Sequence, residues 1–417
     1  MKIQRDFYLN QLIAGRENGL IKIITGIRRC GKSYLLFNLF HEWLNDNGID
    51  DNHIIEVALD DRSNKALRDP DALLDYVKSQ ITDKSLHFIL LDEIQIVSEF
   101  TDVLNSLLHI RNADVYVTGS NSHFLSTDVV TEFRGRGDEI RLHPLSFAEF
   151  CQGFQGEKGK AWKEYYTYGG LPLVLSLDTG QKKADYLTNL YQSVYLVDIL
   201  ERHKIKNKAE FDELVKIMAS SIGSPCNPTK LSNTFKSVKK VEIHHHTISK
   251  YLSYLSDAFV LEKSVRYDIK GKKYINTLSK YYFSDLGIRN ALLGFHQQEE
   301  SHIMENIIYN ELRVRGYHVD VGMVEERTTD RNNKTISKQY EVDFVANQGN
   351  KRYYIQSAFA MPYEAKIRQE TASLTRIDDS FKKIIVVKDD IMPKRDENGI
   401  VTIGIMDFLL RPDSLDY

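Results

Sequence analysis

Eight consecutive residues near the N-terminus have the composition and spacing of a phosphate-binding loop. Residues 26–33 read Gly-Ile-Arg-Arg-Cys-Gly-Lys-Ser, which matches G-x-x-x-x-G-K-[ST]. The two glycines let backbone N–H groups curve around phosphate oxygens, and the N-terminus of the next helix adds partial positive charge. We expect Lys32 to reach the β- and γ-phosphates and Ser33 to ligate Mg²⁺. The predicted ATP contacts come from Gly26, Ile27, Arg28, Arg29, Cys30, Gly31, Lys32, Ser33 and Tyr34.

The flanking sequence predicts the two elements that must position such a loop. Leu20–Thr25 is a short, apolar, β-rich run, which predicts a strand. After the loop, Tyr34–Leu44 repeats apolar residues at helical spacing, which predicts a helix. A chance glycine turn at a helix start is the alternative, and it leaves this strand–loop–helix order unexplained.

Two adjacent carboxylates follow another predicted strand. Residues 86–93 read Leu-His-Phe-Ile-Leu-Leu-Asp-Glu, the pattern of a buried parallel strand with acids at its end, as in a Walker B motif. A further strand is predicted over His53–Leu59. Asp92 is expected to hold the Mg²⁺ shell and Glu93 to polarise the attacking water. The alternative is an acidic surface turn after a core strand.

A strand over Asp114–Gly119 is followed by Ser120 and Asn121. In AAA+ and related ATPases a polar residue at this strand tip senses the γ-phosphate and helps to place the water. We predict that role for Asn121, with the capping of a turn as the alternative.

A glycine-flanked loop carries Arg134 and Arg136. A loop arginine here can act as a finger on the γ-phosphate of a neighbouring subunit. An ordinary solvated basic loop is the alternative, and it is the weaker one for Arg136. Shortly afterwards, Ser146 and Glu149 form an S-x-x-E pattern that predicts a helix start.

Taken together, these strings resemble a prokaryotic family of AAA-type ATPases, similar to the archaeal and STAND-like branch of P-loop proteins. The resemblance covers essentially the whole chain and implies that Arg136 is the finger. It also implies that Gly170–Pro172 packs against bound nucleotide, and that the C-terminal domain, of unknown function, is related to restriction endonucleases. The strings are GIRRCGKS, LLDEIQ, TGSNS, FRGRG, HPLSFAEF and YGGLP.

The length of 417 residues and the element pattern predict an α/β protein of several domains. The first is a P-loop AAA-type core with a parallel sheet. The predicted domains are the ATPase core at 1–152, a helical lid at 153–223, a winged helix-turn-helix at 224–295 and a restriction-endonuclease-like domain at 296–417.

The predicted winged helix-turn-helix rests on the order helix, helix, β-hairpin. Its second helix and hairpin are candidates for DNA contact, and protein contact is nearly as good an interpretation. We expect the three consecutive histidines at 244–246 to point in different directions and not to share a metal ion. The candidate DNA contacts are His245, His246, Thr247, Ser249, Lys250, Arg266, Lys270, Lys272 and Lys273.

From His302 the order of elements, α-β-β-β-α-β, resembles the PD-(D/E)XK nuclease core. Glu305 and Asp343 match its first two acids, but the third motif, (D/E)-x-K, reads Gln356-Ser357-Ala358 and lacks both its acid and its lysine. Lys366 is a candidate replacement for that lysine. We expect a degenerate domain used for binding or support, and an active nuclease is the alternative.

Composition favours a cytoplasmic protein. The net charge of −3 gives no global basic field, and the three cysteines are scattered, as expected in a reducing compartment. No signal peptide or long apolar run is visible. We expect a homo-oligomer in which ATP hydrolysis moves the winged-helix and nuclease-like module, which contacts DNA or a protein client. The alternatives are a slow nucleotide-dependent switch and an ATP-powered nuclease.

Overall fold

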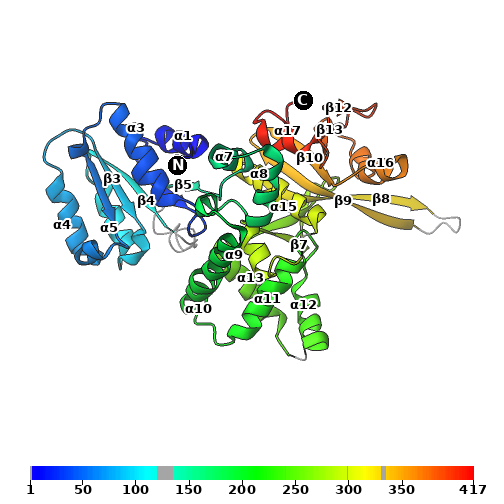
Figure 1. Ribbon diagram of the computed structural model, residues 1–417, viewed down its shortest axis with the longest axis horizontal. Helices are drawn as coiled ribbons and strands as arrows, with labels where there is room; N and C mark the ends of the chain where they lie inside the picture. The colour runs from blue at the N-terminus through cyan, green and yellow to red at the C-terminus, as the bar shows by residue number, and fades with distance from the viewer. Residues whose placement is uncertain (1, 120–134, 240, 298, 330–334) are drawn as a thin grey trace. The chain divides into compact units, whose positions relative to one another are not determined.

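The computed structural model describes residues 2–119, 135–239, 241–297, 299–329 and 335–417 (Figure 1). The chain forms two compact units. The first comprises the chain up to Leu145 together with the short segments Leu171–Leu173 and Asp257–Phe259, and the second comprises the remainder. Each unit is described by itself.

The first unit is built on a five-stranded sheet in the order β2-β3-β4-β1-β5, in which every pairing is parallel. Most of its strand positions are buried, as expected for a parallel sheet covered on both faces. The strands are β1 (Ile21–Thr25), β2 (Ile54–Ala58), β3 (His87–Asp92), β4 (Ala113–Thr118) and β5 (Gly137–Arg141).

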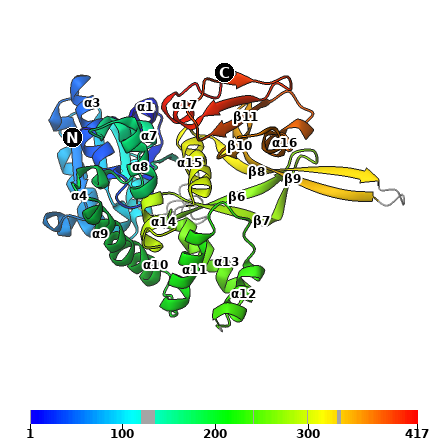
Figure 2. The same ribbon diagram turned by 45° about the vertical axis from the view of Figure 1, so that its right-hand side comes forward.

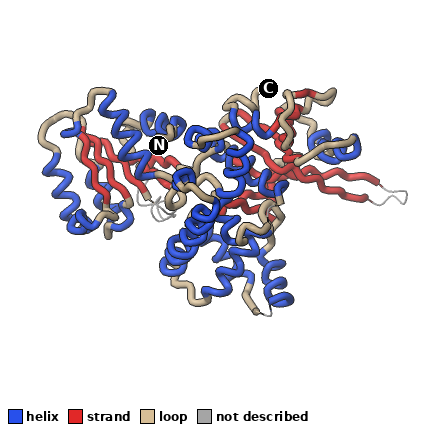
Figure 3. The backbone as a smooth tube through the Cα atoms, viewed as in Figure 1, coloured by secondary structure: helices blue, strands red, loops and turns tan. Residues whose placement is uncertain are grey.

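Helices cover both faces of this sheet (Figures 1 and 3). On one face, residues such as Ile89 and Leu91 pack with Val77 and Leu104 from two helices. On the other face, the ring of Phe40 lies 4.6 Å from that of Tyr116. The helical elements are α1 (Asp6–Ala14), α2 (Lys32–Tyr34), a π-helical segment (Leu35–Phe40), α3 (His41–Asp46), α4 (Pro70–Gln80) and α5 (Phe100–Leu107).

Strand order decides which residues share the carboxyl edge of the sheet. Because β4 lies between β1 and β3, its last residue, Thr118, stands between the end of the phosphate-loop strand and the two acids. The register pairs Ile24 with Thr118 and Leu91 with Val117, so the three strands end nearly level.

The second unit begins with α-helices. The Ser146–Glu149 capping box is confirmed: the N–H of Glu149 donates to the Ser146 hydroxyl, and the N–H of Ser146 donates to the Glu149 carboxylate. The predicted lid is helical. Its helices are α7 (Phe147–Gly153), α8 (Lys158–Tyr168), α9 (Gly180–Leu190), α10 (Val197–Arg202) and α11 (Lys208–Ser220), followed by α12 (Pro228–Thr234) and α13 (His245–Asp257).

A mixed eight-stranded sheet, in the order β12-β13-β11-β10-β9-β8-β6-β7, forms the rest of the second unit. Figure 2 shows the long β8–β9 hairpin extending beyond the other strands. The strands are β6 (Leu261–Asp268), β7 (Lys273–Phe283), β8 (His318–Thr329), β9 (Thr335–Gln348), β10 (Lys351–Ala358), β11 (Lys382–Val387), β12 (Lys394–Arg395) and β13 (Val401–Gly404). The helices are α14 (Leu286–Leu292), α15 (Glu300–Val314), α16 (Glu364–Thr371) and α17 (Ile405–Leu410).

The predicted boundary at residue 296 runs through this sheet. The β6–β7 hairpin, expected to be the wing of a separate domain, pairs in parallel with β8 through Arg266 and Val321. Strand pairing of this kind joins segments that no local sequence pattern connects. The α/β class and the parallel sheet of the first unit are confirmed. In the described part of the chain, no helix combines the length and apolar character needed to cross a membrane.

A buried ion pair joins β1 to β4. The ammonium of Lys22 contacts Asp114, and their side chains are 0% and 6% exposed. The hydroxyl of Tyr116 donates to the same carboxylate over 2.9 Å. Burial lowers the pKa of Lys22, while Asp114 acts in the opposite direction.

We predict that Lys22→Met lowers the melting temperature, because it leaves the Asp114 carboxylate buried without its cation. The free energy of unfolding should fall by about 3–5 kcal/mol. Lys65→Met, at an exposed position, is the matched control and should melt like the wild type. Adding Asp114→Asn to Lys22→Met should restore part of the loss. Equal melting temperatures for Lys22→Met and Lys65→Met would contradict a stabilising role for the Lys22–Asp114 ion pair.

Candidate functional site

The loop at 26–33 has a backbone that its glycines make possible. Gly26 has φ 145° and Gly31 has φ 103°, both unfavourable for residues with a Cβ. A Cβ on Gly26 would also collide with the carbonyl oxygen of Leu142. Arg29, with φ 65°, adds a third left-handed residue. The loop therefore curves tightly between β1 and the start of α2.

The lysine of the motif lies along this loop. Lys32 is 4% exposed, and its ammonium donates to the carbonyl oxygens of Gly26 at 3.1 Å and Ile27 at 3.3 Å. Ser33 and Tyr34 are exposed, whereas Cys30 is fully buried. Burial raises the pKa of the Cys30 thiol, so this residue packs as a neutral group.

An arginine from outside the motif holds the loop in place. Arg5, which precedes α1, is 3% exposed and donates to the carbonyl oxygens of Cys30 at 3.2 Å and His143 at 2.7 Å. Its guanidinium lies 4.8 Å from the centre of the Tyr8 ring. The sequence analysis missed Arg5, because a single arginine near the N-terminus carries no motif.

The acid at the end of β3 lies beside the serine of the loop. Asp92 is 3% exposed and accepts a hydrogen bond from the hydroxyl of Thr118, and the Ser33 hydroxyl lies close enough to affect its pKa. Burial raises the pKa of Asp92, and both hydroxyls act in the opposite direction. A hydroxyl and a carboxylate placed together in this way are the hard oxygen donors that Mg²⁺ prefers, so these residues fit the predicted ion.

The second acid is placed by an unusual backbone. Glu93 has φ 53°, in the left-handed region, so the chain turns sharply where β3 ends. Its N–H donates to the Thr118 hydroxyl over 3.0 Å, and the Gln95 amide donates to its carboxylate. Thr118 therefore positions both acids, although the sequence analysis did not select it. Its place at a strand tip was the available signal.

Of the predicted γ-phosphate sensor and the two candidate finger arginines, the structure describes only Arg136. Asn121 and Arg134 lie outside the described residues. Arg136 is exposed, and its carbonyl oxygen accepts from the N–H of Ile21, the first residue of β1. The phosphate loop follows the last residue of β1, so Arg136 lies at the opposite edge of the sheet from its own loop.

In the segment Gly170–Pro172, Pro172 packs beside the loop at 26–33. A Cβ added to Gly31 would lie 3.8 Å from Cγ of Pro172. The N–H of Gly170 instead donates to Asp285 over 2.8 Å. Within this element, then, the proline is the residue next to the nucleotide loop.

The predicted DNA-contacting residues differ in their accessibility. His246, Ser249 and Lys250 are exposed, as are Lys270, Lys272 and Lys273 around the β6–β7 turn. Arg266 points away from solvent, with 14% of its side chain exposed and a nitrogen 3.9 Å from Glu341.

The expectation that the histidine rings at 244–246 diverge is wrong. Their ring centroids lie 4.2–5.1 Å apart. Helix α13 begins at His245, so His244 lies outside the helix and is not bound by its geometry. His245 and His246 are both in the first turn, where their rings nevertheless lie 4.2 Å apart.

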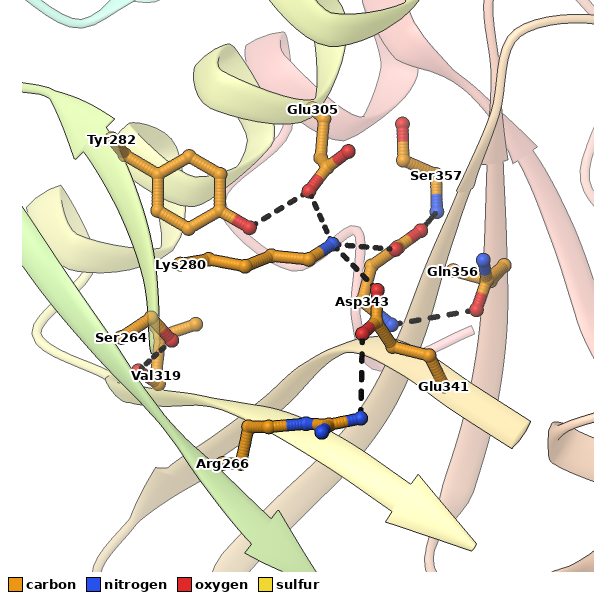
Figure 4. Close-up of polar contacts among 10 residues, drawn as sticks. All are labelled: Ser264, Arg266, Lys280, Tyr282, Glu305, Val319, Glu341, Asp343, Gln356 and Ser357. Atoms are coloured by element: carbon orange, nitrogen blue, oxygen red, sulfur yellow. Dashed lines mark hydrogen bonds and ion pairs between the residues drawn. The ribbon is translucent and has the colours of Figure 1, made fainter. Parts of the chain in front are cut away.

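A second polar cluster lies inside the eight-stranded sheet (Figure 4). The ammonium of Lys280, from β7, lies 2.9 Å from Glu305 of α15, 2.9 Å from Glu341 and 3.4 Å from Asp343, both of β9. The Tyr282 hydroxyl donates to Glu305 over 2.8 Å. One buried cation therefore joins three carboxylates from two further elements.

The cluster has two strong pKa shifts. Burial alone would lower the pKa of Lys280, but Glu305, Asp343 and Glu341 outweigh burial and raise it. Burial, followed by the nearby Glu305 carboxylate, raises the pKa of Asp343 to about 7. Lys280 therefore stays charged at neutral pH, and Asp343 titrates there.

The structure unites the two predicted acids of the nuclease-like motif but not the predicted lysine. Asp343 accepts from the N–H of Ser357 over 2.9 Å, and its own N–H donates to the Gln356 side chain over 3.4 Å. Lys366 is paired with Glu370 on its own helix, at 2.5 Å. Lys280, which has no place in the motif, occupies the centre.

Comparison with known proteins finds two relatives that span most of the chain. An uncharacterized protein of Haemophilus influenzae is 33% identical over 415 residues, which cover 98% of this chain and 99% of the relative. An uncharacterized protein of Methanocaldococcus jannaschii is 28% identical over 391 residues, covering 89% of this chain and 82% of that protein.

Two sequence families match parts of the chain. Residues 18–151 match a family described as an AAA domain, and residues 159–299 match a domain of unknown function. Among solved structures, a Walker-type ATPase of Pyrococcus abyssi has a TM-score of 0.50 and 16% identity, covering 70% of this chain and 96% of that one. At this identity, the likeness concerns the fold.

We predict that Lys280→Met lowers the melting temperature strongly at pH 8, because three carboxylates then share a buried site without their cation. Asp343 has a raised native pKa, so its contribution to stability is present at low pH and is lost as pH rises through about 7. The deficit of Lys280→Met should therefore shrink at pH 5.5.

Lys263→Met is the matched control, since Lys263 is exposed on the neighbouring strand β6. Thermal unfolding at both pH values measures the effect. A Lys280→Met protein that melts like Lys263→Met at pH 8 would contradict a charge-balancing role.

Proposed function

This chain belongs to the same family as the relative from Haemophilus influenzae, and its residues 18–151 match an AAA domain. We propose that it binds and hydrolyses ATP with Mg²⁺ at residues 26–33. The position of Asp92 beside the Ser33 hydroxyl carries this proposal. It links the phosphate loop to the acid of a different strand, which a chance glycine turn would not require.

The proposed roles follow from charge and position. The N–H groups of the loop and the ammonium of Lys32 bind the phosphates, and their positive charge favours the transition state of phosphoryl transfer. Ser33 and Asp92 would hold Mg²⁺, which when bound neutralises phosphate charge. Glu93 orients and polarises the attacking water, and its turned backbone keeps it next to Asp92.

We further propose that Arg136 acts on the nucleotide of a neighbouring subunit. Its exposed position at the far edge of its own sheet supports action between chains rather than within one. This role requires a homo-oligomer. Asn121 keeps its proposed role as the γ-phosphate sensor.

ATP turnover would then drive the second unit, which offers an exposed set of lysines and histidines for DNA or a protein client. A slow switch, in which ATP occupancy gates binding, is the alternative. Turnover that stays near zero both with and without duplex DNA would favour the switch.

We propose that the nuclease-like part of the second unit does not cut DNA. Glu305 and Asp343 are 9% and 7% exposed, and the Lys280 ammonium contacts both. The Lys280 ammonium thus occupies the position between these carboxylates that a catalytic divalent metal ion would need. The domain would serve binding or support.

For the ATPase, we predict that Glu93→Gln retains ATP binding but lowers kcat at least tenfold, because the amide cannot act as a base. A tenfold change corresponds to about 1.4 kcal/mol of transition-state stabilisation. Phosphate release measures kcat, and ATP titration measures affinity. Wild-type turnover in this variant would remove Glu93 from its proposed role.

A second prediction concerns Thr118, a positioning residue. Thr118→Val removes the hydroxyl that serves Asp92 and Glu93 and should lower kcat about tenfold, equivalent to roughly 1.4 kcal/mol. Thr118→Ser keeps the hydroxyl and should restore turnover. If Thr118→Ser and Thr118→Val lower kcat equally, the size of the Thr118 side chain, and not its hydrogen bonds, accounts for the loss of turnover.

The cleavage proposal is tested with supercoiled plasmid incubated with Mg²⁺ or Mn²⁺, with and without ATP. We expect intact plasmid with the wild-type protein. Nicking that disappears in Glu305→Gln would show that the cluster is an active nuclease and would overturn the proposal.

A further inference from the structure

Three side chains of the first unit form a cluster that the nucleotide site does not use. They are His53, which precedes β2, Asp83, in the connection from α4 to β3, and His87, the first residue of β3. One nitrogen or oxygen atom from each lies within 4.8 Å of the others. Nε2 of His53 is 3.0 Å from Oδ2 of Asp83.

The parallel sheet brings the two histidines together. The register pairs Ile54 of β2 with Phe88 of β3, so the preceding residues, His53 and His87, are neighbours. Their ring centroids lie 4.9 Å apart. The N–H of Ser85 donates to Oδ1 of Asp83 over 2.8 Å, which leaves Oδ2 in contact with the imidazole of His53.

His87 is the informative member of this cluster. It is 0% exposed, and its Nδ1 lies 2.9 Å from the carbonyl oxygen of Ser85. A carbonyl only accepts, so Nδ1 carries the hydrogen and Nε2 presents a lone pair. That buried Nε2 has no hydrogen-bond partner among the described residues. A buried acceptor left unpaired in this way destabilises the folded chain.

A metal ion would satisfy this lone pair. Histidines that bind metals typically donate their other ring N–H to a carbonyl or carboxylate, as Nδ1 of His87 does. An imidazole that merely packed in the core would gain nothing from a buried nitrogen left unpaired.

We propose that His53, Asp83 and His87 bind Zn²⁺. Two imidazoles and one carboxylate suit this ion, and three protein ligands leave a position for water. That open side faces solvent, since the side chains of His53 and Asp83 are 21% and 49% exposed.

The ion would be structural, because it lies far from the nucleotide. His87 begins β3 and Asp92 ends it, so five residues at about 3.3 Å each separate the two sites by roughly 16 Å. Bound there, the ion would fasten the α4–β3 connection to the start of β2. The proposal does not depend on ATP hydrolysis.

The competing site is the cluster of histidine rings at 244–246, of which His244 and His246 are exposed and His245 is half-buried. It has no carboxylate ligand and no buried unpaired nitrogen among its described atoms. The histidine cluster at 244–246 must nevertheless be eliminated by mutation before zinc binding can be assigned to His53, Asp83 and His87. The test therefore uses an untagged full chain carrying His244→Asn, His245→Asn and His246→Asn, stripped with EDTA and returned to chelator-free buffer without nucleotide.

Titration of this protein with ZnCl₂ by calorimetry should show about one ion per chain and a raised melting temperature. His53→Gln and Asp83→Asn should each weaken binding at least tenfold and abolish the thermal shift. His109→Gln, at an exposed position, is the matched control and should bind normally. X-ray absorption at the zinc edge should show two imidazoles and oxygen ligands.

The proposal is overturned if the stripped protein binds no zinc, if His53→Gln and Asp83→Asn bind like the control, or if the absorption spectrum shows sulfur ligands. His87→Gln should also lose zinc. Should that buried variant fail to fold, the two partly exposed positions decide the question.

Discussion

The hydroxyl of Thr118 holds together the edge of the sheet at which the proposed chemistry takes place. It donates to Asp92 and accepts from the backbone of Glu93, so one side chain fixes both acids at the end of β3. It can do so only because β4 lies between β1 and β3. The loop after β1, the acids after β3 and the hydroxyl between them form one unit because three parallel strands end level with one another.

Buried cations illustrate how the number of neighbouring carboxylates decides protonation. Lys22 contacts one, Asp114, and burial lowers its pKa despite that partner. Lys280 contacts three, Glu305, Asp343 and Glu341, and together they outweigh the effect of burial and raise its pKa. Each lysine ties separate elements together, but only the second has a charge that its surroundings strongly favour.

The second unit shows how a sheet can combine distant parts of the sequence. The β6–β7 hairpin supplies Lys280 to acids that lie 25 and more residues further along the chain. Because β6 pairs with β8, the hairpin becomes part of the sheet that carries the acids. The same pairing turns Arg266 away from solvent and towards Glu341. Of the four hairpin residues predicted to contact DNA, Lys270, Lys272 and Lys273 around the turn are exposed, and Arg266 is not.

The sequence alone determined the phosphate-loop motif, the two acids at the end of β3, four strands of the first unit and the order of elements from α15 to β11 in the second. These features depend on local spacing, hydrophobic periodicity and glycine, which act over a few residues. Tertiary structure decided the rest: Arg5 on the loop backbone, Thr118 between the acids, Lys280 among its three carboxylates, and His53 beside His87. Each of these contacts joins residues that are distant in sequence or depends on strand order and register, and no pattern along one segment encodes those.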